Sequence, residues 1–415
     1  MSAQDFRLLD PETLAEPYEF WQALRETAPI LAVDEGVGFT IVSRYDDVLT
    51  VLRDTDTFST RLSRKFKGGL SAYEDSPAVK EVLKDGCPYV DALGFSEGDV
   101  HARHRRMVRR GFTTARVREL DELIEATVKD LIDALPMGVE VDMWSRFCIP
   151  LPIRVIGHII GVDAEHDQDV KRWADAQVAR FGEPRESEEE NLRIARDLVD
   201  FHQYLYRQIR ERRERARDDF LSDLVNADSA TTDNELVILT AGLLVAGAES
   251  SSSMVAALID LLLDHPQWAG NVRADRSLVP ATVEEALRNE SPIKMAYRIT
   301  TRDTELAGEA IPAGSIVLVM LASANRDPRA FTDPEQFRPD RPDSRRHVAF
   351  GLGTHLCLGA ELARSEGRAA LRQLLDRTSS ITRGSHRPVH PPNLTVRAVR
   401  SLPVVLHPPT AKRVS

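Results

Sequence analysis

Apolar residues recur three and four positions apart over most of residues 98–290, and this spacing predicts a body built of helices. The most apolar stretch runs from Asn234 to His265, where Pro266 stops it. At 1.5 Å per residue, a helix of that length would be about 48 Å long. Short segments with strand character, such as PILAV and GFTIVSR, precede the helices, and SIVLVMLA follows them. The pattern therefore predicts a mainly α protein with small β-sheets.

The chain gives no sign of separate domains, because it has no linker, internal repeat or low-complexity tract. We expect one domain over residues 1–415, with a β-containing part at about 1–60, a helical body at about 98–290 and a β-rich part at about 291–415. The segment from Thr55 to Gly98 is irregular. A long irregular segment in a compact protein is often a functional lid, and we expect that role here.

Charge and cysteine usage exclude several classes of protein. The formal net charge is −11, from 54 basic and 65 acidic residues, which argues against a general nucleic-acid binder. The first residues lack the apolar core of a signal peptide, and the most apolar stretch is interrupted by Glu249 and four serines. We therefore expect no membrane span and a cytoplasmic protein. Cys87, Cys148 and Cys357 are far apart, so a disulfide framework or structural zinc site is not expected.

The last cysteine lies in a glycine-rich loop, FGLGTHLCLG, which covers Phe350–Gly359 and precedes a helical pattern. The unpaired N–H groups and the dipole at a helix N-terminus favour the thiolate form of a cysteine. The neighbouring glycines let the backbone curve toward the sulfur and let a flat ligand approach closely. A single thiolate can be the axial ligand of an iron that four porphyrin nitrogens already hold.

Two other interpretations of Cys357 stay open on the evidence of this loop alone. One is a buried, inert cysteine. The other is a nucleophile with His355 nearby as its base. A phosphate-binding loop is not supported, because no Lys-Ser or Lys-Thr pair follows the glycines.

The loop resembles the haem-binding loop of cytochrome P-450 monooxygenases, whose pattern is Phe-Gly-x-Gly-x-His/Arg-x-Cys-x-Gly. The resemblance implies that haem b is the cofactor, that O2 is a co-substrate, and that Cys357 is the axial ligand of the haem iron. It implies that Phe350 shields the sulfur, and that the haem lies between a long central helix and the cysteine-loop helix of a triangular prism-like fold. The pattern is met at Phe350, Gly351, Gly353, His355, Cys357 and Gly359.

Other motifs follow the same family's order, so the resemblance covers nearly the whole chain. The segment EALR places Glu285 and Arg288 three residues apart, on one helix face, where they can pair. It matches the Glu-x-x-Arg motif of the family. FRPDR resembles the family's meander, and the resemblance implies that Arg341 completes a buried network with this pair. ANRDP, at residues 324–328, is typical of the bacterial branch.

The haem propionates need cationic or hydrogen-bonding partners. The resemblance gives this role to His101 and Arg105, which share a helix face, and to Arg298 and His355. It also implies an electron donor, a ferredoxin or flavodoxin with its NAD(P)H-dependent reductase. A basic cluster on an acidic chain suits such an acidic partner; its remaining arginines are Arg103, Arg106, Arg109 and Arg110.

The long helix carries LLVAGAESSSS, which resembles the family's Ala/Gly-Gly-x-Asp/Glu-Thr pattern at Ala246, Gly247, Glu249 and Ser250. An acid beside an alcohol can deliver protons during oxygen activation. Ser250 stands where the family usually has threonine, so its hydroxyl is less restrained and efficient coupling is in doubt. Glu249 and Ser250 are thus the expected catalytic residues.

These features predict a monomeric haem-thiolate monooxygenase that inserts one oxygen atom from O2 into a small organic substrate. The alternatives are a haem-thiolate peroxygenase or oxidative coupling enzyme, and a non-catalytic haem-binding sensor. Lys294 is a candidate partner for a substrate carboxylate or phenolate, or else it reaches water or a propionate. The expected pocket walls are residues 55–98, 181–191, 243–248 and 293–296 and the turn near Asn393. The expected pocket side chains are Leu244, Ala248, Lys294 and Met295.

Overall fold

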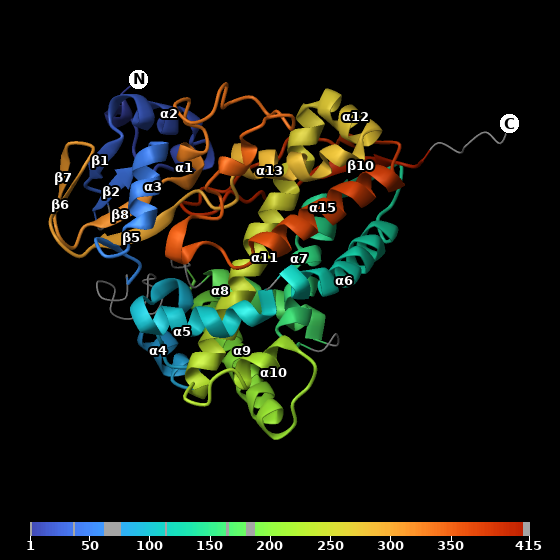
Figure 1. Cartoon of the computed structure of the whole chain (residues 1–415). Coiled ribbons are helices and arrows are strands. Elements are labelled where there is room, and N and C mark those ends of the chain that lie inside the picture. Colours follow the sequence, from blue (N-terminus) through green and yellow to red (C-terminus); the bar gives the residue numbers. More distant parts are fainter. Residues whose placement is uncertain are drawn as a thin grey trace. The chain divides into compact units, whose positions relative to one another are not determined.

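The computed structural model describes residues 2–35, 38–61, 76–112, 114–162, 166–179 and 187–409. These residues are mainly helical with small sheets, which confirms the predicted fold class. Residues 62–75 of the expected lid and 181–186 of an expected pocket wall lie outside the described residues. The chain forms two compact units, so the expectation of one domain stays a prediction. Unit 1 comprises Met1–Ser59, Asp121–Leu151 and Ser250–Ser415, and unit 2 comprises Thr60–Leu120 and Pro152–Glu249 (Figure 1).

Unit 1 contains the sheets. Its N-terminal elements are α1 (Pro11–Ala15), α2 (Tyr18–Thr27), β1 (Ile30–Val33), β2 (Phe39–Val42), α3 (Tyr45–Arg53) and β3 (Phe58–Ser59). Its later elements are β4 (Glu140–Asp142), α12 (Pro266–Ala274), α13 (Val279–Asn289), β5 (Ala296–Thr300), β6 (Thr304–Leu306), β7 (Glu309–Ile311), β8 (Ile316–Val319), α14 (Leu321–Ala324), α15 (Ala360–Arg377), β9 (Ser380–Arg383) and β10 (Pro403–His407).

The largest sheet of unit 1 has the strand order β1-β2-β8-β5-β3. β2 and β8 are parallel, with Val42 opposite Val319, and the other pairs are antiparallel. All four residues of β8 are buried, as expected for a central strand with both faces covered. Val48, Val51 and Leu52 of α3 pack on this sheet and form one apolar core with it.

Three helices join segments of both units: α6 (Thr114–Asp133), α7 (Pro150–Ile159) and α11 (Asp233–Asp264). The predicted long helix thus appears within one residue of its expected ends. Thr232 and Glu235 cap its start reciprocally, because the Glu235 carboxylate accepts from the Thr232 amide at 2.9 Å and the Glu235 amide donates to the Thr232 hydroxyl at 3.3 Å. Among the described residues, α11 is the one helix with the length and composition of a membrane span, and 61% of its most apolar window is buried.

Unit 2 is helical in its described residues. Its further helices are α4 (Pro77–Leu83), α5 (Gly98–Arg109), α8 (Asp167–Ala179), α9 (Glu188–Glu214) and α10 (Phe220–Val225). Trp173 of α8 stacks on Phe201 of α9 with ring centroids 4.8 Å apart. Val79 of α4 packs on Ile194 and Leu198 of α9.

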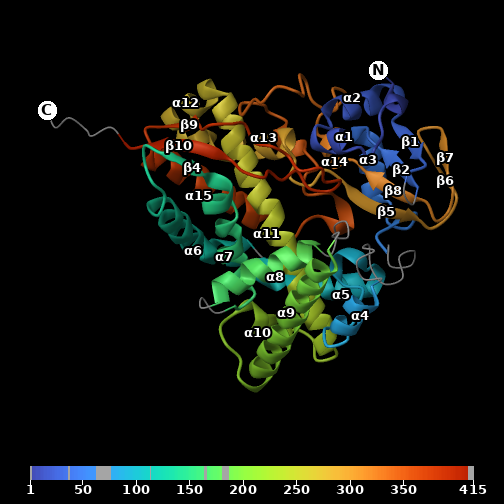
Figure 2. The ribbon, with the colours of Figure 1, turned by 180° about the vertical axis from the view of Figure 1, so that it is seen from behind.

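In unit 1, α15 is held along its length by α6, and both views show these helices side by side (Figures 1 and 2). The Gln373 side chain donates to the Glu125 carbonyl at 2.8 Å and to the Glu125 carboxylate at 2.6 Å. Ser365 donates to Asp121, and Arg377 to Asp133. These contacts fix the helix that begins directly after the cysteine loop.

Candidate active site

The cysteine loop is a tight turn that presents the sulfur of Cys357 on its surface. Gly351 and Gly353 have φ of +68° and +70°, a left-handed conformation that L side chains rarely adopt. A Cβ on Gly353 would also lie 3.0 Å from the Leu52 carbonyl oxygen. The Cys357 amide donates to the Phe350 carbonyl at 2.9 Å, which closes the loop.

Exposure distinguishes Cys357 from the other cysteines. Cys357 is exposed, Cys87 is half-buried, and Cys148 is buried, with burial raising the pKa of the Cys148 thiol well above its usual value. The interpretation of Cys357 as a buried, inert thiol is therefore wrong. Cys357 lies three residues before the first residue of α15, close to the positive end of that helix, which suits a thiolate.

Phe350 is anchored by a polar cluster that the sequence did not reveal. The Arg364 guanidinium lies 4.7 Å from the Phe350 ring centroid, and the His347 ring lies 5.7 Å from it. Both side chains bind the Glu284 carboxylate, Arg364 at 2.6 Å and 3.1 Å and His347 at 3.1 Å. Burial would raise the pKa of Glu284, but these hydrogen bonds outweigh it and lower the pKa to about 2. A charged, fully bonded carboxylate thus fixes the start of the cysteine loop.

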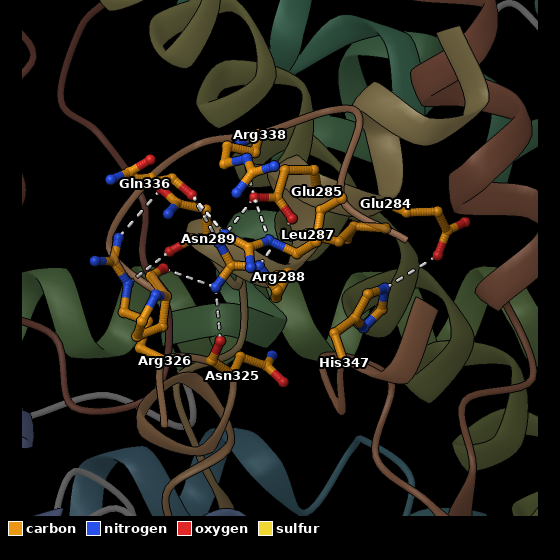
Figure 3. A network of polar contacts seen from close by, with 12 residues as sticks. Glu284, Glu285, Leu287, Arg288, Asn289, Asn325, Arg326, Gln336, Arg338 and His347 are labelled. Atoms are coloured by element: carbon orange, nitrogen blue, oxygen red, sulfur yellow. Dashed lines mark hydrogen bonds and ion pairs between the residues drawn. The ribbon is translucent and has the colours of Figure 1, made fainter. Parts of the chain in front are cut away.

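Glu285, Arg288 and Arg341 meet in one buried network, as the Glu-x-x-Arg resemblance implied. Figure 3 shows Glu285 and Arg288 in this network, with Arg338 beside them. Glu285 and Arg288 have no exposed surface. Arg288 makes two hydrogen bonds of 2.8 Å to the Glu285 carboxylate, and Arg341 approaches it at 3.2 Å. The Arg338 amide donates to the same carboxylate at 2.9 Å.

The remaining donors of Arg288 and Arg341 satisfy main-chain carbonyls of the segment before the cysteine loop. Arg288 donates to the carbonyls of Asn325 and Pro334, both at 2.8 Å, and of Gln336 at 3.1 Å. Arg341 donates to the carbonyls of Thr332, Asp333 and Gln336. The network therefore holds an irregular segment in one conformation, with two buried arginines sharing the single Glu285 carboxylate and directing their other donors to carbonyl groups.

The four expected propionate partners lie in two groups. His101 and Arg105 share one face of α5 in unit 2, where His101 is buried. Burial, followed by the nearby Arg105 charge, lowers the pKa of His101, so a neutral imidazole can still donate one N–H. In unit 1, Arg298 lies on β5, between β8 and β3, and donates to the Tyr297 carbonyl at 2.7 Å, and His355 ends the turn before Cys357. The meeting of the two groups at one haem stays a prediction.

The neighbouring His104 fixes the orientation of α5. It has no exposed surface and accepts a hydrogen bond from the Leu93 amide at 3.4 Å. Its other ring nitrogen lies 3.3 Å from the Glu235 carboxylate, at the start of α11. Arg103 also binds Glu235, so this arginine of the basic cluster is engaged within unit 2.

Glu249 and Ser250 lie side by side in sequence in the middle of α11. Burial, with a smaller contribution from the Asp175 charge, raises the pKa of Glu249 to about 7. A carboxyl group with that pKa can both give and take a proton at neutral pH. Gly247 has a packing role within unit 2, because a Cβ there would lie 3.2 Å from two carbons of Ile156.

A second buried acid, Glu366 of α15, was not predicted. It is 2% exposed, and burial raises its pKa to about 8, although a hydrogen bond with Ser251 lowers it. Glu366 is therefore largely protonated at neutral pH. It lies beside Ser251, which directly follows Ser250. Its neighbourhood, ARSEGRAALR, looks like a solvated helix face, and no sequence signal marks it.

The expected pocket side chains are buried. Leu244, Ala248 and Met295 are at most 5% exposed, and Lys294 is 3% exposed. The Lys294 ammonium donates to the main-chain carbonyls of Leu14, at 2.9 Å, and Asn393. Contact of these side chains with a substrate stays a prediction.

Comparison with known proteins agrees with this arrangement. A model of the cytochrome P450 family matches residues 184–400. The 6-deoxyerythronolide B hydroxylase of Saccharopolyspora erythraea is 34% identical over 94% of this chain and 96% of that protein. Cytochrome P450 monooxygenase PikC of Streptomyces venezuelae is 33% identical over 96% of this chain and 93% of that protein. The solved structure of cytochrome P450 CYP109Q5 from Chondromyces apiculatus has a TM-score of 0.85 and 33% identity, covering 97% of this chain and 98% of that one.

The chain therefore belongs to the cytochrome P450 family. It is an oxidoreductase, a monooxygenase of the class that uses haem b and incorporates oxygen from O2. The residues present fit the haem. The exposed Cys357 thiol lies at the start of α15. Gly351 and Gly353 let a flat ligand approach the loop around it closely.

Proposed function

We propose that this protein hydroxylates, epoxidises or dealkylates a small organic substrate in the cytoplasm, as a monomer, with electrons from a ferredoxin or flavodoxin and its NAD(P)H-dependent reductase. The observation that carries the proposal is the exposed Cys357 thiol in its glycine loop at the start of α15. Cys357 would hold the haem iron, and His101, Arg105, Arg298 and His355 would bind the propionates. When bound, the haem supplies the iron at which O2 is activated.

The experiment that tests this function compares two oxidants. Ligands from a library of small organic molecules are first selected by the spectral change that they cause in the ferric protein. Each is then incubated under 18O2 with a ferredoxin, its reductase and NADPH, or with hydrogen peroxide alone. Reductase-dependent incorporation of one 18O atom supports the monooxygenase. Product formed with peroxide alone would indicate the peroxygenase instead.

Proton delivery would run through the middle of α11. Glu249, with a pKa of about 7, would exchange protons with water, and the Ser250 hydroxyl would pass them to the site of oxygen activation. Glu366 would be a second protonated carboxyl group beside this segment, through Ser251.

We expect Ser250→Ala to keep consuming NADPH while product per NADPH falls at least about tenfold, because reduced oxygen leaves as hydrogen peroxide when protons arrive late. Product and peroxide formed per NADPH are the measurements. Ser250→Thr should preserve or improve coupling, and Glu249→Gln should slow turnover. Wild-type coupling in Ser250→Ala would show that protons reach the site without Ser250.

The electron donor is proposed to dock on the basic cluster of α5. Arg106, Arg109 and Arg110 are exposed, on a chain with a net charge of −11. We expect Arg109→Glu to slow reduction by ferredoxin about three- to tenfold at low salt, and less at high salt, because charge complementarity steers the encounter. Stopped-flow reduction under carbon monoxide measures the rate.

Arg210→Glu is the matched control, since Arg210 is an exposed arginine on α9 of the same unit. Equal rates for both variants, or rates that ionic strength leaves unchanged, would place the docking surface elsewhere.

A further inference from the structure

Lys294 is the meeting point of three segments that are far apart in the sequence. Its ammonium donates to the Leu14 carbonyl in α1 at 2.9 Å and to the Asn393 carbonyl. Its own amide donates to the Thr395 carbonyl at 2.7 Å, and its carbonyl accepts from the Ala322 amide at 3.0 Å. One residue thus joins α1, α14 and the turn that begins at Asn393.

The turn is organised around the same point. The Asn393 side-chain oxygen accepts from the amides of Thr395 and Val396, at 2.8 Å and 2.7 Å. Val396 forms an isolated β-bridge with Ile293. The backbone contacts keep the turn next to the segment before β5, and the Lys294 side chain closes the side that faces α1.

The surroundings of the ammonium leave little room for a ligand. Lys294 is 3% exposed, and it borders a cavity of about 10 Å³ with Leu8, Phe20, Trp21 and Leu394 among its walls. Such a volume holds one water molecule at most. Burial, followed by the nearby Arg397 charge, lowers the pKa of Lys294 to about 7, and the two carbonyl acceptors are what make a buried amine tolerable there.

Arg397 adds a second tie to the same helix end. It donates to the Ala15 carbonyl, and to the Tyr18 hydroxyl at 2.9 Å. It also lies 3.3 Å from Glu290, so its charge is compensated within the cluster. The end of α1 is therefore bound by two buried basic side chains, Lys294 at the Leu14 carbonyl and Arg397 at the Ala15 carbonyl.

We infer that Lys294 is a positioning residue, which braces the Asn393–Arg397 turn against α1 and so sets the shape of the substrate-pocket wall expected from residues 293–296 and the Asn393 turn. The effect on the pocket rests on the proposed function, because that function requires a substrate pocket at this wall. The brace itself rests on the Lys294 contacts within unit 1. The lysine would then act on every ligand of the pocket, whatever the ligand's charge, and no substrate anion would pair with it.

The test replaces Lys294 by methionine, which keeps the length of the side chain and removes its donors. We expect amide hydrogen exchange to accelerate about tenfold in peptides that cover residues 12–17 and 393–397, while peptides of β9 stay at the wild-type rate. Lys171→Met is the matched control, because the Lys171 side chain is 42% exposed on α8, where it pairs with Asp175. The reduced carbon monoxide complex of Lys294→Met should have the wild-type spectrum. A changed spectrum would show that haem ligation has failed, which is a separate fault from the loss of the brace.

The second readout uses two probes of the pocket, neutral 1-phenylimidazole and the anionic 4-(imidazol-1-yl)benzoate. The spectral dissociation constants of both should change by the same factor in Lys294→Met, about three- to tenfold. A change confined to the anionic probe would overturn the inference in favour of direct ion pairing. Unchanged exchange in residues 12–17 and 393–397, or unchanged constants for both probes, would overturn it as well. If Lys294→Met does not fold, Lys294→Gln is measured with the same criteria.

Discussion

Replacement of Glu285 by glutamine is expected to lower the free energy of unfolding by about 3–5 kcal/mol, because it leaves buried arginines without their counter-charge. Glu285 and Arg288 are fully buried, and the carboxylate accepts four hydrogen bonds from Arg288, Arg341 and the Arg338 amide. A glutamine keeps the shape but turns one acceptor into a donor that faces other donors. The segment before the cysteine loop would lose its anchor at the same time.

Chemical denaturation followed by circular dichroism measures the loss, and the haem content of the purified variant reports on the loop. Glu119→Gln is the matched control, since Glu119 pairs with Arg116 at the same spacing of three residues, at 2.7 Å, but with its side chain 60% exposed. An exposed pair contributes about 0.2–1 kcal/mol. If Glu285→Gln were as mild as Glu119→Gln, the network would not be what holds this segment.

The helical part of the fold could be predicted because its signal is local. The long helix was expected from Asn234 to His265 and is observed over Asp233–Asp264, since an unbroken apolar run and a following proline mark such an element directly. The pairing of β10 with β4 and β9 could not be predicted in the same way. These strands are short and separated by long stretches of chain, so their partners depend on the tertiary fold.

The residues of the candidate site likewise divide into those that a local sequence pattern marks and those that it does not. The cysteine loop and the Glu-x-x-Arg pair could be found from the sequence, because each lies within a few consecutive residues. Glu366 and the partners of Lys294 could not, because a charged residue in an ordinary sequence context is usually solvated. Only the packing of α15 shows that Glu366 is buried, and only the position of α1 shows which carbonyls Lys294 reaches.

The exposure of Cys357 also explains why this cysteine, and neither Cys87 nor Cys148, is expected to bind the haem iron. Cys148 is buried with a raised pKa, so its thiol stays protonated. Cys87 has contacts within unit 2, where its sulfur lies 3.5 Å from the Asn234 carbonyl. Cys357 combines exposure, a helix start and a closed glycine loop, which together favour a thiolate that binds a metal.

The carbon monoxide difference spectrum of the reduced protein tests the central claim most directly, because a thiolate ligand shifts the Soret band strongly to the red. We predict that the wild type and Cys87→Ala show the shifted band, and that Cys357→Ala loses it completely while any haem that remains bound absorbs at the ordinary position. A shifted band that survives in Cys357→Ala, or its absence from the wild type loaded with haem, would contradict the assignment of Cys357 as the thiolate ligand.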